Sequence, residues 1–315
     1  MNSYLSVICV LVVSSVSLPA DSFRLEGEPY RTSAPIAWSS TVSNLPASVM
    51  VYKVLPQQFS KEWLSNVLAL ANFTKTPTQA SADPKTMSWR YEERGALVRS
   101  LNLAPLYGYV NYHNYQVTGF NTNAPIGVPD RDEVDRLAMR YLQELGGETN
   151  ELYFQHRAGT ERKQRRFDKK TGKYSQEFVT MRGVMYSRQL DGIRFVGAGG
   201  RGGFAIDFGE GAKIASLELD WRRFQPYRRY STLSRDDIVK EIMNGKAVIS
   251  AENGEIPENP SKLNISKITP LYMSQTSGNP EDFIFPFANI EIVAVTTGTN
   301  ATTFYIDCPL ISGGP

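Results

Sequence analysis

Three short amphipathic helices, each followed by a long strand-like stretch, constrain the fold of this chain more than any other feature. Ser60, Asp130 and Ser234 each give a polar N-cap, and an acidic residue follows within one turn. Behind these caps, apolar residues recur at i, i+3 and i+4, the spacing of one buried helix face. The second and third helices are expected to end at Gly146 and Gly245. The residues expected in the core include Leu137, Tyr141, Leu142, Ile238 and Ile242.

The stretches between the helices predict antiparallel strands joined by tight turns. Phe204, Ile206 and Phe208 alternate with small or polar residues, and a hairpin turn is expected between Gly209 and Gly211. A helix followed by antiparallel strands is typical of the α+β class, whereas crossover helices between strands would indicate a parallel sheet. The sequence therefore predicts an α+β fold of tandem modules, each a helix packed on a curved antiparallel sheet.

The N-terminus predicts export. Leu5 to Leu18 is apolar or small, and small residues follow as far as Ala20, which is typical of a secretory signal peptide. The run is shorter than the roughly 20 apolar residues that span a bilayer. No Lys or Arg precedes it, so an N-terminal apolar strand and an uncleaved membrane anchor stay as alternatives. The expected location is secreted or extracytoplasmic, in the periplasm or cell envelope. The predicted parts are a signal peptide at 1–20, a linker at 21–45, and α+β modules at 46–125, 126–230 and 231–315.

The net charge gives no support for nucleic-acid binding, and the cysteine content gives none for an internal disulfide. The chain holds 34 Lys and Arg against 32 Asp and Glu, so its net charge of +2 gives no bulk attraction to nucleic acid. Cys9 lies in the expected signal peptide, which leaves Cys308 alone in the mature chain. No internal disulfide is therefore expected, and Cys308 is predicted to be a buried thiol.

The sequence contains or lacks several motifs of known cofactor, metal and catalytic sites, and none of them occurs with the neighbouring residues that such a site needs. Gly197 to Gly202 spells a dinucleotide-binding pattern, but the alternating residues after it predict a strand where the pyrophosphate needs a helix N-terminus. A glycine-rich hairpin loop is expected instead. His113 and His156 lack the spacing of a zinc site, and no nucleophile elbow occurs. We therefore predict no cofactor, no dinucleotide, no metal and no catalytic motif.

The order of elements resembles two extracytoplasmic families. Ser234 to Gly245 leads into strands, and upstream lie Asp191-Gly-Ile-Arg-Phe-Val-Gly197 and hairpins that end in Trp221. Over about residues 130–310 this resembles secreted PepSY-like modules and the YycH/YycI-type regulators of a cell-wall sensor kinase. The resemblance implies a helix lying on a curved antiparallel sheet, and a non-enzymatic role such as restraining a protease or tuning a membrane partner. YycH/YycI-type proteins keep an N-terminal membrane helix, whereas this N-terminus looks cleavable.

Two segments are candidate binding surfaces. The first is an alternating strand face whose aromatic rings suit sugars or a protein partner, with cross-strand packing as the alternative. It contains Tyr107, Tyr109, Asn111, His113 and Tyr115. The second interleaves bases with aromatic residues between Trp221 and Tyr230, with an inter-domain connector as the alternative. Its candidate residues are Trp221, Arg222, Arg223, Tyr227, Arg228 and Arg229.

These observations favour an exported, non-enzymatic binding or regulatory protein that acts on a protein or an anionic envelope polymer. Membrane contact is expected only through an uncleaved N-terminus. The alternative is a secreted hydrolase of glycan or cell-wall substrate, with Glu218 and Asp220 on one strand face as its carboxylate pair. The basic run from Arg162 to Lys170 is predicted to form the tip of a long hairpin.

Overall fold

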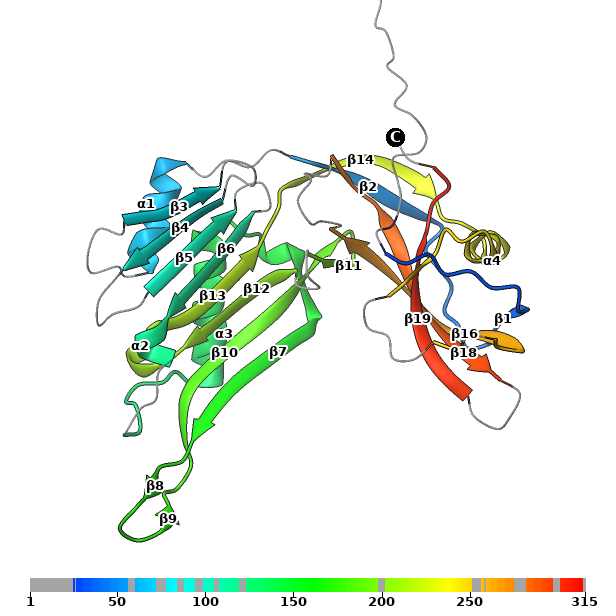
Figure 1. Cartoon of the computed structure of the whole chain (residues 1–315). Helices are drawn as coiled ribbons and strands as arrows, with labels where there is room; N and C mark the ends of the chain where they lie inside the picture. The colour runs from blue at the N-terminus through cyan, green and yellow to red at the C-terminus, as the bar shows by residue number, and fades with distance from the viewer. Residues whose placement is uncertain are drawn as a thin grey trace, which may run out of the picture.

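The computed structural model describes residues 25, 27–55, 60–71, 78–83, 88–93, 99–104, 108–118, 123–197, 202–250, 256–257, 259–274, 282–296 and 301–313. Figure 1 shows an arch of two lobes. Strands β2 (Ser48–Val54) and β14 (Phe224–Ser231) run across its top. The expected signal peptide at 1–20 lies outside the described residues.

The described residues contain four α-helices: α1 (Lys61–Leu70), α2 (Tyr115–Thr118), α3 (Arg131–Glu144) and α4 (Arg235–Met243). The three predicted N-caps are confirmed. The Ser60 hydroxyl accepts from the Trp63 backbone N–H at 3.0 Å, and the Asp130 carboxylate accepts from that of Glu133 at 2.9 Å. The Ser234 hydroxyl does the same for Asp237 at 3.2 Å. Each cap satisfies a donor that a helix N-terminus leaves open.

Fourteen strands of the described residues form one mixed sheet that passes through both lobes. Most neighbours are antiparallel, but β16 (Lys262–Met273) pairs in parallel with both β1 (Ile36–Trp38) and β11 (Ile193–Val196). Strand β7 (Leu152–Gln164) lies beside β10 (Phe178–Leu190). In the second lobe the strand order of the sheet is β15 (Val248–Ile249), β19 (Ala301–Pro309), β18 (Pro286–Val295), β16 and β11. It continues in the first lobe with β10, β12 (Gly203–Phe208), β13 (Ile214–Asp220), β6 (Tyr109–Asn114), β5 (Arg99–Ala104), β4 (Ser88–Glu93) and β3 (Thr78–Asp83). Strands β1 and β7 lie off this path.

A second sheet has the order β14-β2-β17, where β17 is Phe283–Ile284. Strand β2 is buried on both faces because its side chains alternate between two hydrophobic clusters. Val49 and Val51 pack with Phe285, whereas Tyr52 packs with Tyr272. This bridging sheet therefore joins the two lobes and leaves β14 at its edge.

Each lobe has its own core. In the first lobe α1 and α3 cover one face of the sheet, as Figure 1 shows, and α3 buries Val134, Leu137, Ala138 and Leu142. In the second lobe Ile238 and Ile242 of α4 pack on β16, β18 and β19. The burial expected for four of the five predicted core residues is confirmed, and Tyr141 is half-buried. Cys308 is fully buried as predicted, and this burial raises its thiol pKa to about 12.

The prediction of an α+β fold in tandem modules is wrong. The described chain is mostly β, and its strands share one large mixed sheet instead of closing into separate modules. The reason is long-range pairing: β13 pairs with β6, β14 with β2, and β11 with β16. Alternation places a side chain on one face of a strand, but it does not choose the neighbouring strand. Strand β1 lies within the expected linker at 21–45.

Two local predictions are confirmed. Strand β12 follows Gly202, so no helix opens behind the glycine-rich segment, whose residues 198–201 lie outside the described ranges. The basic run from Arg162 lies at the end of the β7–β10 hairpin, which continues into β8 (Phe167–Asp168) and β9 (Lys173–Tyr174). In Figure 1 this tip projects well beyond the first lobe.

Candidate binding surfaces

The outer face of the bridging sheet carries exposed aromatic rings. Tyr227 is 50% exposed, and its ring centroid lies 5.0 Å from that of Phe283. Phe283 in turn contacts the ring of Phe285, at 6.3 Å between centroids. Phe283 and Phe285 belong to the cluster that covers Val49 and Val51 of β2, and Tyr227 extends this aromatic row to the exposed surface.

Three cations share this outer face. Arg228 pairs across the sheet with Val51, and Lys53 pairs with Gln225, so alternation puts Arg223, Arg228 and Lys53 on one side. All three are exposed, and none forms an ion pair with any described residue. The Arg228 guanidinium lies 5.5 Å from the centre of the Tyr230 ring, within cation–π range. We call Lys53, Arg223, Tyr227, Arg228 and Phe283 the basic-aromatic face.

The other predicted residues of this segment lie elsewhere. Trp221 and Arg222 are 5% and 2% exposed, so they lie beneath the surface instead of on it. Arg229 points to the opposite side of β14 and forms an ion pair with Asp191 at 2.7 Å. The interleaved pattern does not separate Arg228 from Arg229, because a β-bulge between Pro226 and Arg228 shifts the alternation. Trp221 and Arg222 precede β14, and their burial depends on contacts with distant residues such as Arg188.

Arg188, which the sequence did not single out, occupies the junction beneath the bridging sheet. Its side chain is fully buried and donates to the Glu151 carboxylate and, at 2.6 Å, to the Arg222 carbonyl. The guanidinium also lies 4.6 Å from the Trp221 ring centre and 4.7 Å from that of Phe224. Burial lowers its pKa below the usual range, which Glu151 opposes. Arg188 thus ties the first lobe to β14.

The predicted aromatic face of β6 is partly present. Tyr109, Asn111 and His113 are half-exposed on the side of the sheet opposite the helices, while Val110 and Tyr112 point into the core. Tyr115 begins α2 and is 51% exposed, and its ring lies 5.9 Å from that of His113. Tyr107 lies outside the described residues.

The same open face contains a polar cluster that sequence reasoning missed. Asp207 accepts hydrogen bonds from Thr160 and Ser216, each at 2.6 Å. Thr160 reaches Asp207 across Gly183, where an added Cβ would lie 2.0 Å from the carboxylate. A glycine in the middle of a long strand was the available signal, because such a glycine often marks a close approach.

Glu218 and Asp220 also face this side, but their surroundings differ. Asp220 is 9% exposed, and desolvation raises its pKa to about 7 against the opposing charges of Arg222 and Arg188. Glu218 is half-exposed beside Asn111. Burial thus raises the pKa of Asp220 toward neutrality, while Glu218 lies in a position that is more open to solvent.

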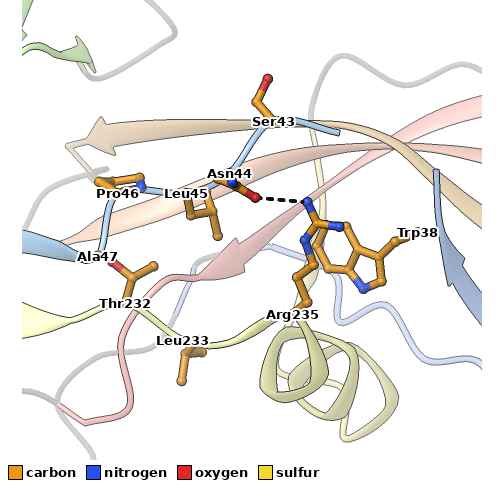
Figure 2. A pocket seen from close by; sticks show the side chains of 9 residues that line it. All are labelled: Trp38, Ser43, Asn44, Leu45, Pro46, Ala47, Thr232, Leu233 and Arg235. Carbon is orange, nitrogen blue, oxygen red and sulfur yellow. Dashed lines mark hydrogen bonds between the residues drawn. The ribbon is translucent and has the colours of Figure 1, made fainter. Parts of the chain in front are cut away.

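Two hollows of the described structure are lined by charged side chains. Figure 2 shows the first, of about 270 Å³, where the Arg235 guanidinium lies over the Trp38 ring. Arg235 already donates to the Val42 carbonyl and, at 3.4 Å, to Asn44. Its charge therefore fastens the 42–47 segment to α4 instead of facing a free site.

The second hollow, of about 830 Å³, lies among α1, α2, α3, β5 and β6. Its charged wall contains Arg99, which forms a buried ion pair with Glu93 at 2.9 Å. The Tyr112 hydroxyl at this wall donates to the Ala71 carbonyl at 2.8 Å. Lys213 and Glu210 add one charge of each sign, so the lining has no preference for an ion of either charge.

Among the described residues, no group of three or more His, Cys, Asp or Glu side chains is placed to hold a metal ion. Over the same part of the chain, none of the helices has the length and apolar character needed to cross a membrane.

Comparison with known proteins identifies no family for this chain. No family model matches the chain, and no curated protein matches it. A solved structure of an uncharacterized protein from Eubacterium rectale is similar with a TM-score of 0.43 and 12% identity, covering 89% of this chain and 88% of that one. The resemblance to PepSY-like and YycH/YycI-type proteins therefore stays a prediction.

Proposed function

We propose that this protein is an exported, non-enzymatic binding or regulatory protein that captures an anionic partner of the cell envelope on its basic-aromatic face. Support for export comes from the apolar run between Leu5 and Leu18. The role is the one that a resemblance to extracytoplasmic regulators implies.

One observation carries the proposal: three exposed cations, none of which pairs with an acid among the described residues, share one face of the bridging sheet with the Tyr227–Phe283 ring pair. Lys53, Arg223 and Arg228 place donors beside Tyr227 and Phe283. Flat rings beside cationic donors suit the carboxylates of an acidic protein segment or an anionic polymer. The edge of β14 is an unsuitable template for a partner strand, because Pro226 and a bulge interrupt it.

A titration with a labelled poly-glutamate peptide tests the charge requirement. The triple variant Lys53→Gln, Arg223→Gln, Arg228→Gln should bind about tenfold more weakly at low salt, since exposed charge pairs each contribute roughly 0.2–1 kcal/mol. The difference should shrink as salt rises and screening increases. Recovery of partners from native envelope extract then identifies the natural ligand.

The matched control removes three exposed positive charges elsewhere: Arg229→Gln, Lys262→Gln, Lys267→Gln. Arg229 is adjacent in sequence to Arg228 but lies on the opposite side of β14. Both triple variants should fold, since exposed substitutions rarely alter a core. Equal binding of the two triple variants at low salt would reject the basic-aromatic face as the capture surface.

The raised pKa of Asp220 favours one second candidate, a glycan hydrolase. Glycoside hydrolysis uses a pair of carboxyl groups, one of which has a raised pKa and acts as the general acid. Release of reducing ends from cell-wall glycan by wild type, lost in both Glu218→Gln and Asp220→Asn, would establish this activity. The binding proposal expects no release from any of the three.

Mass spectrometry of the exported protein tests the processing step. Cleavage near Ala20 is expected because small residues end the apolar run there. An intact Met1 on exported material would show that the segment is kept.

A further inference from the structure

The β8–β9 tip exposes two large aromatic side chains away from any core. Phe167 and Tyr174 pair across the hairpin and are 49% and 68% exposed. Their ring centroids lie 5.0 Å apart at an interplanar angle of 54°, so the rings contact each other, and neither belongs to a hydrophobic cluster of the described residues. Exposed apolar rings at a projecting tip cost solvation free energy, which a binding partner would recover.

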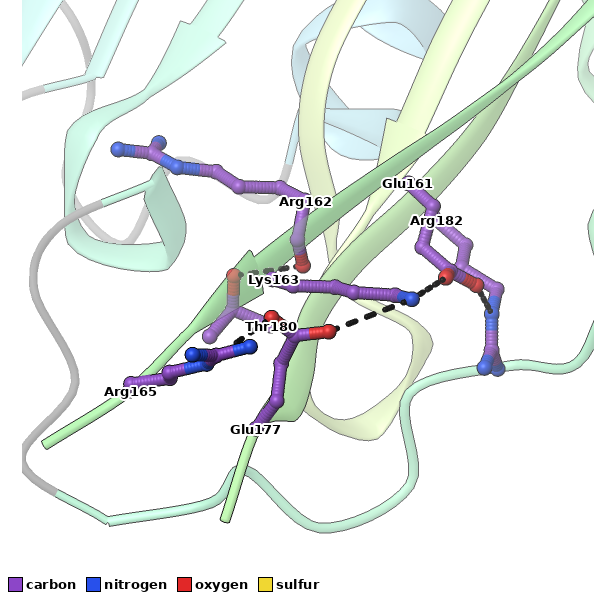
Figure 3. A network of polar contacts seen from close by, with 7 residues as sticks. All are labelled: Glu161, Arg162, Lys163, Arg165, Glu177, Thr180 and Arg182. Carbon is purple, nitrogen blue, oxygen red and sulfur yellow. Dashed lines mark hydrogen bonds and ion pairs between the residues drawn. The ribbon is translucent and has the colours of Figure 1, made fainter. Parts of the chain in front are cut away.

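The tip is also the most basic part of the chain. Residues 162–177 contain seven Lys and Arg and two acids, which gives five net positive charges where the whole chain carries +2. Near the base of the tip, Figure 3 shows Glu161 and Glu177 pairing with Lys163, Arg165 and Arg182. This network sets two carboxylates against three cations, so it neutralises most of the charge of the hairpin where the hairpin leaves the lobe.

Beyond that network the charges are not balanced. Arg166, Lys169, Lys170 and Lys173 form no ion pair with any described residue. The nearby acid, Asp168, accepts the Lys170 backbone N–H at 2.8 Å, and this bond lowers its pKa. Asp168 is thus engaged in shaping the turn, and the four cations are left to attract an external anion.

We propose that this hairpin tip docks on an anionic lipid bilayer, with Phe167 and Tyr174 entering the interfacial layer and the surrounding cations contacting lipid headgroups. A narrow tip that projects from the body meets a flat bilayer before the rest of the molecule does (Figure 1). Aromatic rings partition to the headgroup level, and each nearby Lys or Arg adds attraction to acidic lipids.

Lipid fits these rings better than nucleic acid does. Stacked bases need ring faces laid along a cationic groove. Here the two rings are tilted against each other at the end of a two-stranded ribbon. The sequence alone placed membrane contact only at an uncleaved N-terminus, so this surface is an independent one. It also differs from the basic-aromatic face, which belongs to the bridging sheet at the top of the arch, far from the β8–β9 tip (Figure 1).

Co-sedimentation of the mature chain with phosphatidylcholine vesicles, with and without 30% phosphatidylglycerol, tests the proposal. Wild type should bind the anionic vesicles, and the variant Phe167→Ser, Tyr174→Ser should lose most of that binding. Lys169→Gln, Lys170→Gln should weaken it about fivefold for each lysine, the factor that corresponds to about 1 kcal/mol per charge near a membrane surface. Raising the salt should reduce binding further.

Two controls separate the tip from the rest of the surface. Phe154→Ser removes an aromatic ring that is 61% exposed on the body, and Lys262→Gln, Lys267→Gln removes two exposed lysines of β16. Both should bind vesicles like wild type. The proposal is overturned if anionic vesicles bind no better than neutral ones, or if the control variants lose as much as the tip variants. It is equally overturned if wild type and tip variants differ in binding single-stranded DNA but not vesicles.

Discussion

At the scale of single residues, buried charge connects the parts of this protein. Arg188 lies between the first lobe and the bridging sheet, with its guanidinium held by Glu151, a backbone carbonyl and two aromatic rings. A fully buried cation is stable only when such partners replace water. Asp220, close enough to feel the charge of Arg188, is a buried acid in the same region. Substitution of either residue should therefore change the free energy of unfolding of the protein.

Truncation of Arg188 should be strongly destabilising. Arg188→Ala leaves Glu151 without its cation and opens a gap between Trp221 and Phe224, so we expect a loss of about 3–5 kcal/mol in the free energy of unfolding by urea titration. Arg188→Met with Glu151→Gln should recover part of this loss, because no charge is stranded. Arg229→Ala, which breaks an exposed ion pair, should cost at most about 1 kcal/mol. Similar costs for Arg188→Ala and Arg229→Ala would contradict the assigned role.

The stability of the protein should fall as pH rises through the titration of Asp220. Its pKa is raised to about 7 in the fold, above an unfolded value of about 3.9. The folded state therefore binds this proton more tightly, and the stabilisation present below about pH 4 is lost progressively up to about pH 7. For a shift of this size the change is on the order of 4 kcal/mol.

Asp220→Asn removes this titration. Urea unfolding between pH 4 and pH 8 should therefore give a flatter stability profile for the variant than for wild type. Parallel profiles for the two proteins would show that Asp220 does not titrate in this range.

At the scale of elements, the sequence predicted what is encoded locally. Three helices begin at Ser60, Asp130 and Ser234, because a cap and a helical period lie within a few residues of each other. The β7–β10 hairpin and the turn after β12 were also predicted, because the residues that encode each of them lie close together in the sequence. Residues whose role depends on a distant partner were missed, such as Arg188 with Glu151 and Thr160 with Asp207. The outward position of Arg228 and the burial of Arg222 likewise depend on pairing with β2 and on contacts across the junction.

Helix α3 should contribute to stability through its buried face. Leu142 is fully buried, and Gly147 packs so closely that an added Cβ would lie 2.1 Å from the Leu142 side chain. Leu142→Ala should cost roughly 2–5 kcal/mol, since a packed site cannot collapse around the cavity. The exposed neighbour Gln143→Ala should stay within about 0.5 kcal/mol. Thermal and urea unfolding of both variants measure the difference, and a Leu142→Ala effect within error would remove α3 from the core.

At the scale of the whole molecule, the two lobes are joined by backbone pairing as well as by side-chain contact. Strand β16 pairs in parallel with β1 and β11, which come from far earlier in the chain. The Tyr272 hydroxyl donates to the Met50 carbonyl at 2.6 Å, and Tyr30 contacts the ring of Phe304 at 5.3 Å between centroids. The second lobe therefore includes N-terminal residues in both its sheet and its core.

Residues 231–315 alone should not fold cooperatively, although the tandem-module pattern would make them a complete unit. The fragment lacks β1 and β11, so both partners of β16 on that side are lost, and Leu263 and Ile265 lose part of their cover. It also lacks Tyr30, Ala34 and Val42 of the same core. Near-ultraviolet circular dichroism during heating should show no sharp transition for the fragment, and mixing with residues 25–230 should restore one. A sharp transition and protease resistance in the fragment alone would mean that the third predicted module is autonomous after all, with the long-range pairing of β16 adding to a core that already closes without it.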